Sequence, residues 1–92
     1  MVVYKYKLLI YTNNVKLPLG AKIVHVGNQN ETPCMWVLIN EKETRFEIRN
    51  FAVVCSGVVF DDSRYISPVG TALLDNGAFV VHVFEFKGQG DD

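Results

Sequence analysis

The chain has 92 residues, 49% hydrophobic and 21% charged, with a formal net charge of -1 and a pI of about 6.1. These values exclude an intrinsically disordered chain and indicate one folded domain. Nine basic and ten acidic residues also lack the positive excess of most nucleic-acid-binding domains. No apolar run is long enough to span a bilayer, and Lys5 and Lys7 interrupt the first one too early for a secretory signal. We therefore predict a cytoplasmic protein with no membrane partner.

The first third of the chain predicts two strands separated by turn residues. Residues 3–12 alternate, with tyrosine, leucine and isoleucine on one face and lysines on the other, which indicates a half-buried strand. The pair Asn13–Asn14 predicts a turn. Pro18 and Gly20 then precede a second predicted strand at about 21–27.

The middle of the chain predicts a loop, a central strand and a half-buried strand. Residues 27–33 are polar and predict a loop, whereas residues 34–40 are apolar on both faces and predict a strand covered on both sides. A charged turn follows at 40–43. Beyond it the chain alternates, and we expect one set of side chains to point inward and the other into solvent. The inward set is Phe46 and Ile48, with Asn50 as an optional third member, and the solvated set is Arg45, Glu47 and Arg49.

The last part of the chain predicts a hairpin. Residues 52–55 and 58–60 continue the strand pattern on either side of a bend at Ser56–Gly57, and residues 61–68 form the longest polar interruption, in which a short helical turn is one option. Asp75-Asn76-Gly77 lies between two apolar runs, which is a strong hairpin signal.

No segment has a sustained helical period, and β-branched and aromatic residues dominate the apolar runs. We therefore predict an all-β domain of six or seven short antiparallel strands with little or no helix, arranged either as a small barrel or as a two-layer sandwich. We expect residues 1–87 to form the domain and residues 88–92 to form a flexible acidic tail.

Three blocks of the sequence resemble, in order and spacing, a family of small, uncharacterised bacteriophage and prophage proteins. They are LPLGAKIVHV at 17–26, MWVLI at 35–39, and the segment from 69 to 85 that ends in HVFE. The resemblance covers nearly the whole chain. It implies a phage gene product that acts in the cytoplasm of an infected bacterial host cell, and it supplies no catalytic residues.

Four residues have side chains that bind zinc in other proteins: His25, His82, Cys34 and Cys55. They are scattered, without the local pair that zinc motifs carry, so we disfavour a metal site and expect no cofactor. Buried, reduced thiols are the favoured interpretation of the cysteines, with a disulfide between strands as the alternative. Each histidine is expected to be half-buried and hydrogen-bonded within the sheet, and the two are candidates for a neighbouring pair.

No pattern in the chain predicts an enzyme. Both cysteines lie among apolar residues, which does not suit a catalytic thiolate, and the adjacent carboxylates Asp61 and Asp62 lie in a polar loop rather than across a cleft. The same loop contains Arg64 and Tyr65, residue types that are enriched in protein-binding hot spots. Asp61, Asp62, Arg64 and Tyr65 are therefore the predicted binding residues, with packing of Tyr65 on the core as the alternative.

These observations favour a small accessory protein of phage type that binds and modulates a bacterial host protein, such as a defence component. One alternative is a nucleic-acid-binding β-barrel, and another is an accessory virion protein; a homodimer also remains open. The aromatic candidates for base stacking are Tyr4, Tyr6, Phe46 and Phe84. The basic candidates are Lys5, Lys7, Lys16, Lys22, Arg45 and Arg49.

Overall fold

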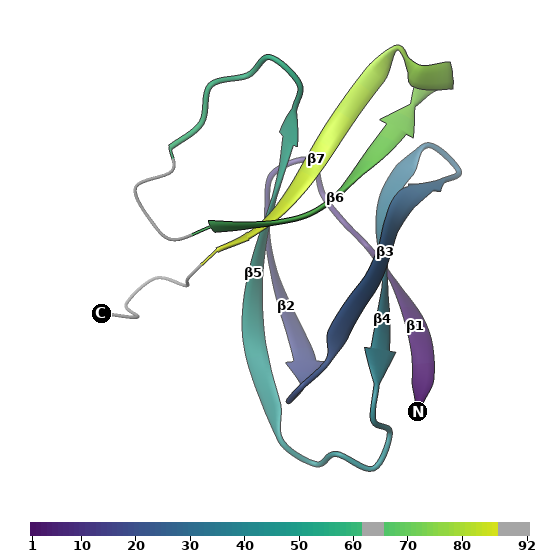
Figure 1. The fold of residues 1–92 in the computed structure, drawn as a ribbon, viewed down its shortest axis with the longest axis vertical. Coiled ribbons are helices and arrows are strands. Elements are labelled where there is room, and N and C mark those ends of the chain that lie inside the picture. The colour runs from purple at the N-terminus through teal and green to yellow at the C-terminus, as the bar shows by residue number, and fades with distance from the viewer. Residues whose placement is uncertain (62–65, 87–92) are drawn as a thin grey trace.

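A computed structural model describes residues 1–61 and 66–86, whose seven strands form two antiparallel sheets. The three-stranded sheet has the order β1 (Val2–Lys7), β4 (Thr32–Ile39), β3 (Lys22–Gln29). The four-stranded sheet has the order β2 (Thr12–Pro18), β5 (Phe46–Cys55), β7 (Phe79–Phe86), β6 (Ile66–Leu74). A single 3₁₀ turn, η1 (Asp75–Gly77), joins β6 to β7 (Figure 1). The prediction of an all-β domain is confirmed, and of its two architectures the two-layer sandwich is the one observed.

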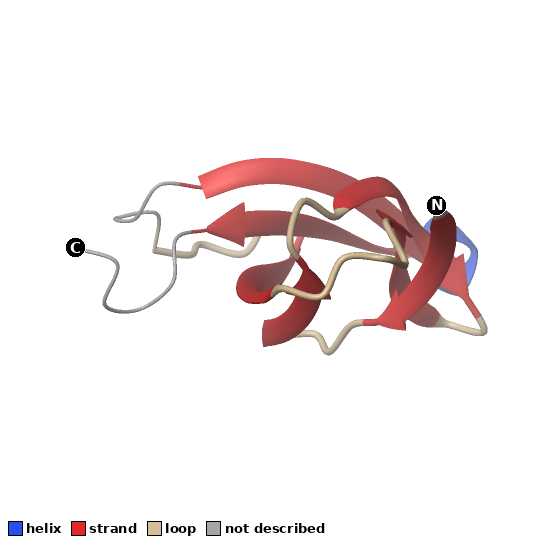
Figure 2. Ribbon diagram, turned by 90° about the horizontal axis from the view of Figure 1, so that it is seen from below, coloured by secondary structure: helices blue, strands red, loops and turns tan. Residues whose placement is uncertain are grey.

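The hydrophobic core lies between the two sheets. The molecule is thin, with principal extents of 40 × 33 × 16 Å, as the view from below in Figure 2 shows. Each strand except β1 contributes at least one buried apolar side chain, because alternate residues of a strand point to the same face. The largest fully buried side chains are Phe51, Leu17, Met35, Val37, Val81 and Val83.

The strand predicted to be central is central. β4 pairs with β1 on one side and with β3 on the other, as its apolar character on both faces indicates. The predicted loop at 27–33 is wrong, since β3 continues to Gln29 and β4 begins at Thr32. Only Asn30 and Glu31 form the turn, with φ of 55° and 62°, the backbone that a two-residue hairpin of type I′ requires.

The predicted turn at Asn13–Asn14 is also wrong, because both residues lie within β2. Asn13 is buried, and its side chain hydrogen-bonds the backbone beside the bend at residues 10–11 that precedes the strand. Its Oδ1 accepts a hydrogen bond from the Leu9 N–H at 2.8 Å, and its Nδ2 donates to the Leu9 carbonyl at 3.0 Å. Asn13 therefore stabilises this bend from the strand that follows it, since short polar side chains often hydrogen-bond nearby backbone groups.

The inward and outward faces of β5 are the reverse of the prediction. Phe46 and Ile48 are exposed, with 53% and 59% of their surface accessible, whereas Arg49 lies on the same side of the strand as the buried Phe51. Arg49 remains inside because its guanidinium binds Glu85 of β7 through two hydrogen bonds of 2.7 and 2.8 Å. Alternation locates two faces but does not say which of them is buried.

Residues 58–60, predicted to continue the strand pattern, form no strand. The bend before them is confirmed, since Ser56–Gly57 is a turn and Gly57 has a φ of 84°. The last three residues of the predicted polar interruption, 66–68, belong to β6. Residues 62–65 of that interruption and the predicted tail at 88–92 lie outside the described residues.

The β6–β7 hairpin is confirmed, and its tip is joined to the tip of the β3–β4 hairpin. Asn28 Nδ2 donates to the Leu73 carbonyl at 2.9 Å, and the Glu31 carboxylate accepts from the Asp75 N–H at 2.7 Å. The Asn28 side chain also accepts from the Glu31 N–H at 2.8 Å. These contacts form a clamp that joins one edge of each sheet at this end of the sandwich.

The turn between β4 and β5 contains the ion pair of Glu43 and Arg45, from which the titration of the Glu43 carboxyl can be predicted. The side chain of Arg45, and then its backbone N–H, donate hydrogen bonds to Glu43 and lower the pKa of that carboxyl from 4.5 to about 2. A lowered carboxyl pKa means that the pair contributes above pH 4.5 and is lost as the pH falls toward 2. An NMR titration of the Glu43 side chain should show this midpoint, and Arg45→Ala should return it toward the ordinary value. A midpoint that Arg45→Ala leaves unchanged would contradict the assignment.

Candidate functional site

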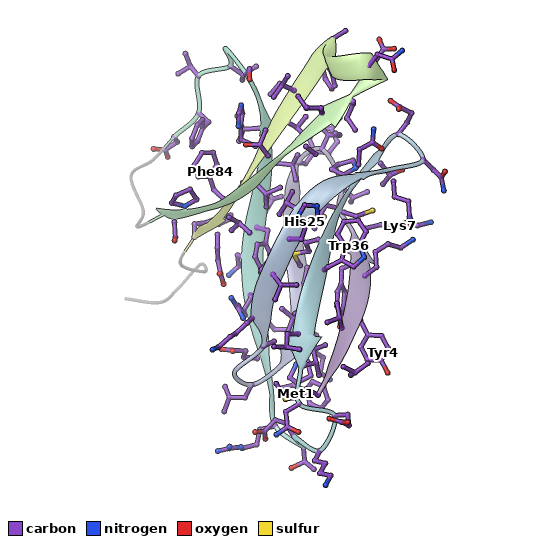
Figure 3. The ribbon with its side chains drawn as sticks, turned by 45° about the vertical axis from the view of Figure 1, so that its right-hand side comes forward. Met1, Tyr4, Lys7, His25, Trp36 and Phe84 are labelled. Carbon is purple, nitrogen blue, oxygen red and sulfur yellow. The ribbon has the colours of Figure 1, made fainter. Side chains whose placement is uncertain are left out.

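An apolar pocket with a volume of about 500 Å³ lies on the outer face of the four-stranded sheet. Its floor consists of outward-facing residues of β5 and β7, including Ala52, Val54 and Phe84. The chain turns at Ser56–Gly57 and returns over this floor, and the ring centroid of Phe60 lies 5.3 Å from that of Phe84. The pocket is therefore formed by a sheet face and the loop that folds back onto it, and Figure 3 labels Phe84 at this place.

The pocket is mostly apolar with a few polar groups at its margin. Volumes of roughly 300 to 1,000 Å³ and linings of this kind are usual for binding sites. Among the described lining residues, Asp61 is the one carboxylate, and the Cys55 thiol is half-buried. The full lining is Ile10, Tyr11, Thr12, Ala52, Val53, Val54, Cys55, Val58, Phe60, Asp61, Phe84 and Phe86.

Apolar surface also lies beyond the pocket. Phe46 and Ile48 are exposed on the outer side of β5, and Val59 is exposed in the returning loop. β5 and β7 therefore carry apolar residues on both faces, which is typical of strands covered on both sides. Exposed apolar surface larger than scattered single residues is typical of interaction sites.

One of the four predicted binding residues is part of this site. Asp61 lines the pocket, whereas Asp62, Arg64 and Tyr65 lie outside the described residues. The sequence interpretation missed the apolar lining. A signal was present, since β5 and β7 have valine, alanine and phenylalanine at both even and odd positions.

His82 lies on the outer face of the same sheet, between two hydroxyls. Its Nε2 is 2.7 Å from Ser56 Oγ, and its Nδ1 is 3.0 Å from Thr71 Oγ1. The expectation of a half-buried histidine bonded across the sheet is confirmed for this residue. In a catalytic triad, a serine contacts a histidine whose other ring nitrogen contacts a carboxylate, and that carboxylate stabilises the imidazolium. Here Thr71 takes the place of the carboxylate, and its hydroxyl carries no charge to stabilise an imidazolium. The two hydrogen bonds therefore link β7 to β6 and to the residue that follows β5, and they do not form a catalytic triad.

The predicted pair of histidines does not form, and the expectation of a half-buried ring is wrong for His25. His25 lies in β3 of the other sheet, where it is exposed and packs against Trp36. Both cysteines are free: Cys34 is buried in β4, and Cys55 ends β5 in the other sheet. No group of three or more metal-binding side chains occurs within residues 1–61 and 66–86.

The predicted stacking platform is divided between the sheets. Tyr4 and Tyr6 belong to β1, whereas Phe46 and Phe84 lie on the outer face of the four-stranded sheet. The predicted basic set is divided in the same way. Lys16 lies over the Phe46 ring, at 5.1 Å from its centroid, and both arginines are paired with glutamates.

Comparison with known proteins identifies one family. The profile described as "Domain of unknown function (DUF7352)" matches residues 1–91, and no curated protein and no solved structure matches the chain. Among the described residues, no helical segment has the length and the apolar character of a membrane span. Since the match spans nearly all of its length, the chain belongs to the DUF7352 family.

Proposed function

We propose that this domain is a small accessory protein that acts by binding another protein through the apolar pocket. The observation that carries the proposal is the pocket of about 500 Å³ on a sheet face whose apolar residues continue beyond it. Pockets of this kind take aromatic or branched side chains from a partner, and such anchors supply most of the affinity of an interface. The proposal assigns no catalysis to the domain.

The apolar residues outside the pocket favour a protein over a small molecule. Phe46 and Ile48 are exposed on the outer face of β5, nearer the start of the strand than the residues that line the pocket. A small ligand would fill the pocket and leave these side chains in water. A protein segment laid along β5 would cover both Phe46 and Ile48, because its length is not limited by the cavity.

The sequence resemblance supports the finer part of the proposal. A phage-type gene product would meet its partner in the cytoplasm of the infected bacterial host cell, and the partner would be a host protein such as a defence component.

A matched pair of variants in one loop tests the pocket. Val58 lines the pocket and Val59 does not, although they are neighbours and both are exposed. We expect Val58→Asp to weaken partner binding at least about tenfold, because it places a charge against an apolar contact. Val59→Asp should retain most of the binding. The measurement is affinity capture of the tagged domain from bacterial lysate, followed by titration of the recovered partner.

Other occupants of the pocket give different results in the same experiment. A partner that is captured equally by wild type and by Val58→Asp would show that the pocket is not the binding site. Self-association that is abolished by Val58→Asp, measured by light scattering, would replace the host partner with a second copy of the chain. A small apolar molecule retained in native mass spectra, with no captured protein, would make the site a ligand pocket.

A further inference from the structure

The outer face of the three-stranded sheet differs in character from the apolar pocket on the other sheet. Its three strands contain no acidic residue, and their charged residues are Lys5, Lys7 and Lys22. The chain as a whole has a net charge of -1, so this sheet concentrates positive charge that the composition hides. The acidic residues among those described lie in turns, in the loop after β5 and in the four-stranded sheet.

Strand register places the lysines and two aromatic rings on one face. Lys5 and His25 both pair with Trp36, which puts the three residues in one row across the sheet. Lys7 lies in the next row, opposite Cys34, and Lys22 lies in the row on the other side, opposite Leu38. Alternate residues of a strand point to the same face of the sheet, so the three lysines, His25 and Trp36 all project from one face. We call Lys5, Lys7, Lys22, His25 and Trp36 the basic aromatic face.

A β-bulge brings His25 onto this face. The register of β3 against β4 shifts between Ile23 and His25, so that Val24 is the extra residue. Without this register shift, Val24 would lie opposite Trp36, and the side chain of His25 would point to the opposite face of the sheet. Bulges commonly re-aim side chains at functional positions. The centroids of the His25 and Trp36 rings are 5.5 Å apart, and the ring planes are inclined by 47°.

Gly27 leaves room for the two rings. A Cβ atom at this position would lie 3.0 Å from His25 Nε2 and 3.7 Å from Trp36 Cζ3. Both rings therefore border the space above Gly27, which a larger residue would fill with its own side chain. Figure 3 shows His25, Trp36 and Lys7 close together, well away from Phe84. Lys5 reaches across β4 to hydrogen-bond Gln29 of β3, which places its ammonium group over the sheet.

We propose that the basic aromatic face binds single-stranded nucleic acid. Flat aromatic rings stack on exposed bases of any sequence, and lysines beside them neutralise phosphates. Three rows of a sheet span roughly 14 Å, from about 3.4 Å per residue, which suits two or three nucleotides. The site is independent of the apolar pocket, since the two belong to different sheets and share no residue.

The protein carries its own reporter for this site, because Trp36 is its single tryptophan. We expect an oligothymidylate of about twelve nucleotides to quench Trp36 fluorescence at low salt, through base stacking on the indole ring. Three lysines predict a slope of about -2 for the logarithm of affinity against the logarithm of salt concentration. No change in fluorescence at low salt, or an affinity that salt does not alter, would overturn the proposal.

Two pairs of lysine variants distinguish binding at the basic aromatic face from nonspecific attraction to positive charge elsewhere on the protein. Lys7→Gln with Lys22→Gln should lower the affinity at least about fivefold and reduce the salt slope to about -0.7. The matched control, Lys16→Gln with Lys42→Gln, removes the same charge from the other sheet and a turn, and it should have little effect. Labelled oligonucleotide anisotropy measures both pairs. Equal losses in the two pairs would overturn the site.

Stacking has a test of its own. Trp36→Phe should retain most of the binding measured by anisotropy, whereas Trp36→Ala should weaken it about fivefold or more. Unchanged melting temperatures of the lysine variants establish that the fold is intact. A polyglutamate peptide that binds as tightly as the oligonucleotide would overturn the nucleic-acid assignment, because it offers charge without bases.

Discussion

Replacing Gly70 by alanine is expected to lower the free energy of unfolding by about 2 to 3 kcal/mol, because the new methyl group has no space. Gly70 lies in β6 and faces Val26 of β3, where the two sheets meet. A Cβ atom at position 70 would lie 2.7 Å from Val26 Cβ and 2.9 Å from its Cγ2. The obstructing atoms include a Cβ fixed to the backbone, so relief requires the strands to move apart. Urea unfolding curves at constant slope measure the loss.

Val26→Ala provides the second half of this test. The single change Val26→Ala should lower the free energy of unfolding by about 2 kcal/mol, because it leaves a cavity between β3 and β6. Combined with Gly70→Ala it should partly relieve the clash, so that the double variant is more stable than the sum of the single changes predicts. Gly20→Ala is the control, since a Cβ atom there would meet nothing within 4 Å and its cost is one of backbone conformation at φ 83°. A Val26→Ala change that rescues Gly20→Ala equally would refute a local clash.

Replacing Arg49 by methionine is expected to destabilise the protein by about 2 kcal/mol, because the change leaves the partly buried carboxylate of Glu85 without its partner. The guanidinium donates two hydrogen bonds to Glu85 and a third, of 2.5 Å, to the Ala21 carbonyl. Methionine retains much of the apolar stem, so the loss reports the polar contacts and not the packing. Since Glu85 raises the already high pKa of Arg49, the arginine stays charged at any usable pH.

Two further variants separate the pair from its surroundings. Arg49→Met combined with Glu85→Gln should recover part of the loss, because no unpaired charge then remains. Arg45→Met removes an arginine from an ion pair whose arginine side chain is 73% exposed, and its effect should be small, as for most surface ion pairs. Chemical unfolding of the wild type and the three variants gives the comparison. Equal effects at positions 45 and 49 would show that burial contributes nothing to the Arg49 pair.

Local patterns predicted those elements whose signal lies within a few residues. The central place of β4 followed from an apolar run on both faces, and the β6–β7 hairpin followed from Asn76-Gly77 between two apolar runs. The predicted turn at Asn13 failed for a physical reason. Its side chain hydrogen-bonds the backbone of Leu9, beside a bend at residues 10–11, and Asn13 itself lies in a strand.

Properties that depend on pairing between distant strands could not be predicted. Arg49 lies on the inward face of β5 with Phe51 and pairs there with Glu85, which is 36 positions away in the chain. The apolar pocket depends on a loop returning over β5 and β7, and the basic aromatic face depends on a one-residue bulge that turns His25 outward. Asp61, which lines the pocket, was predicted as a binding residue because it is polar and in a loop, whereas Val58 and Phe60 resemble core residues in sequence.

The clamp between the two hairpin tips has a consequence for insertions and deletions. Hairpin tips ordinarily accept changes in length, because nothing contacts them. Here Glu31 reaches the Asp75 amide and Asn28 reaches the Leu73 carbonyl, so each tip must lie at a fixed distance from its own sheet. A hairpin longer by one pair of residues would carry its tip past its counterpart. Among related sequences, the lengths of these two hairpins should therefore change together or not at all.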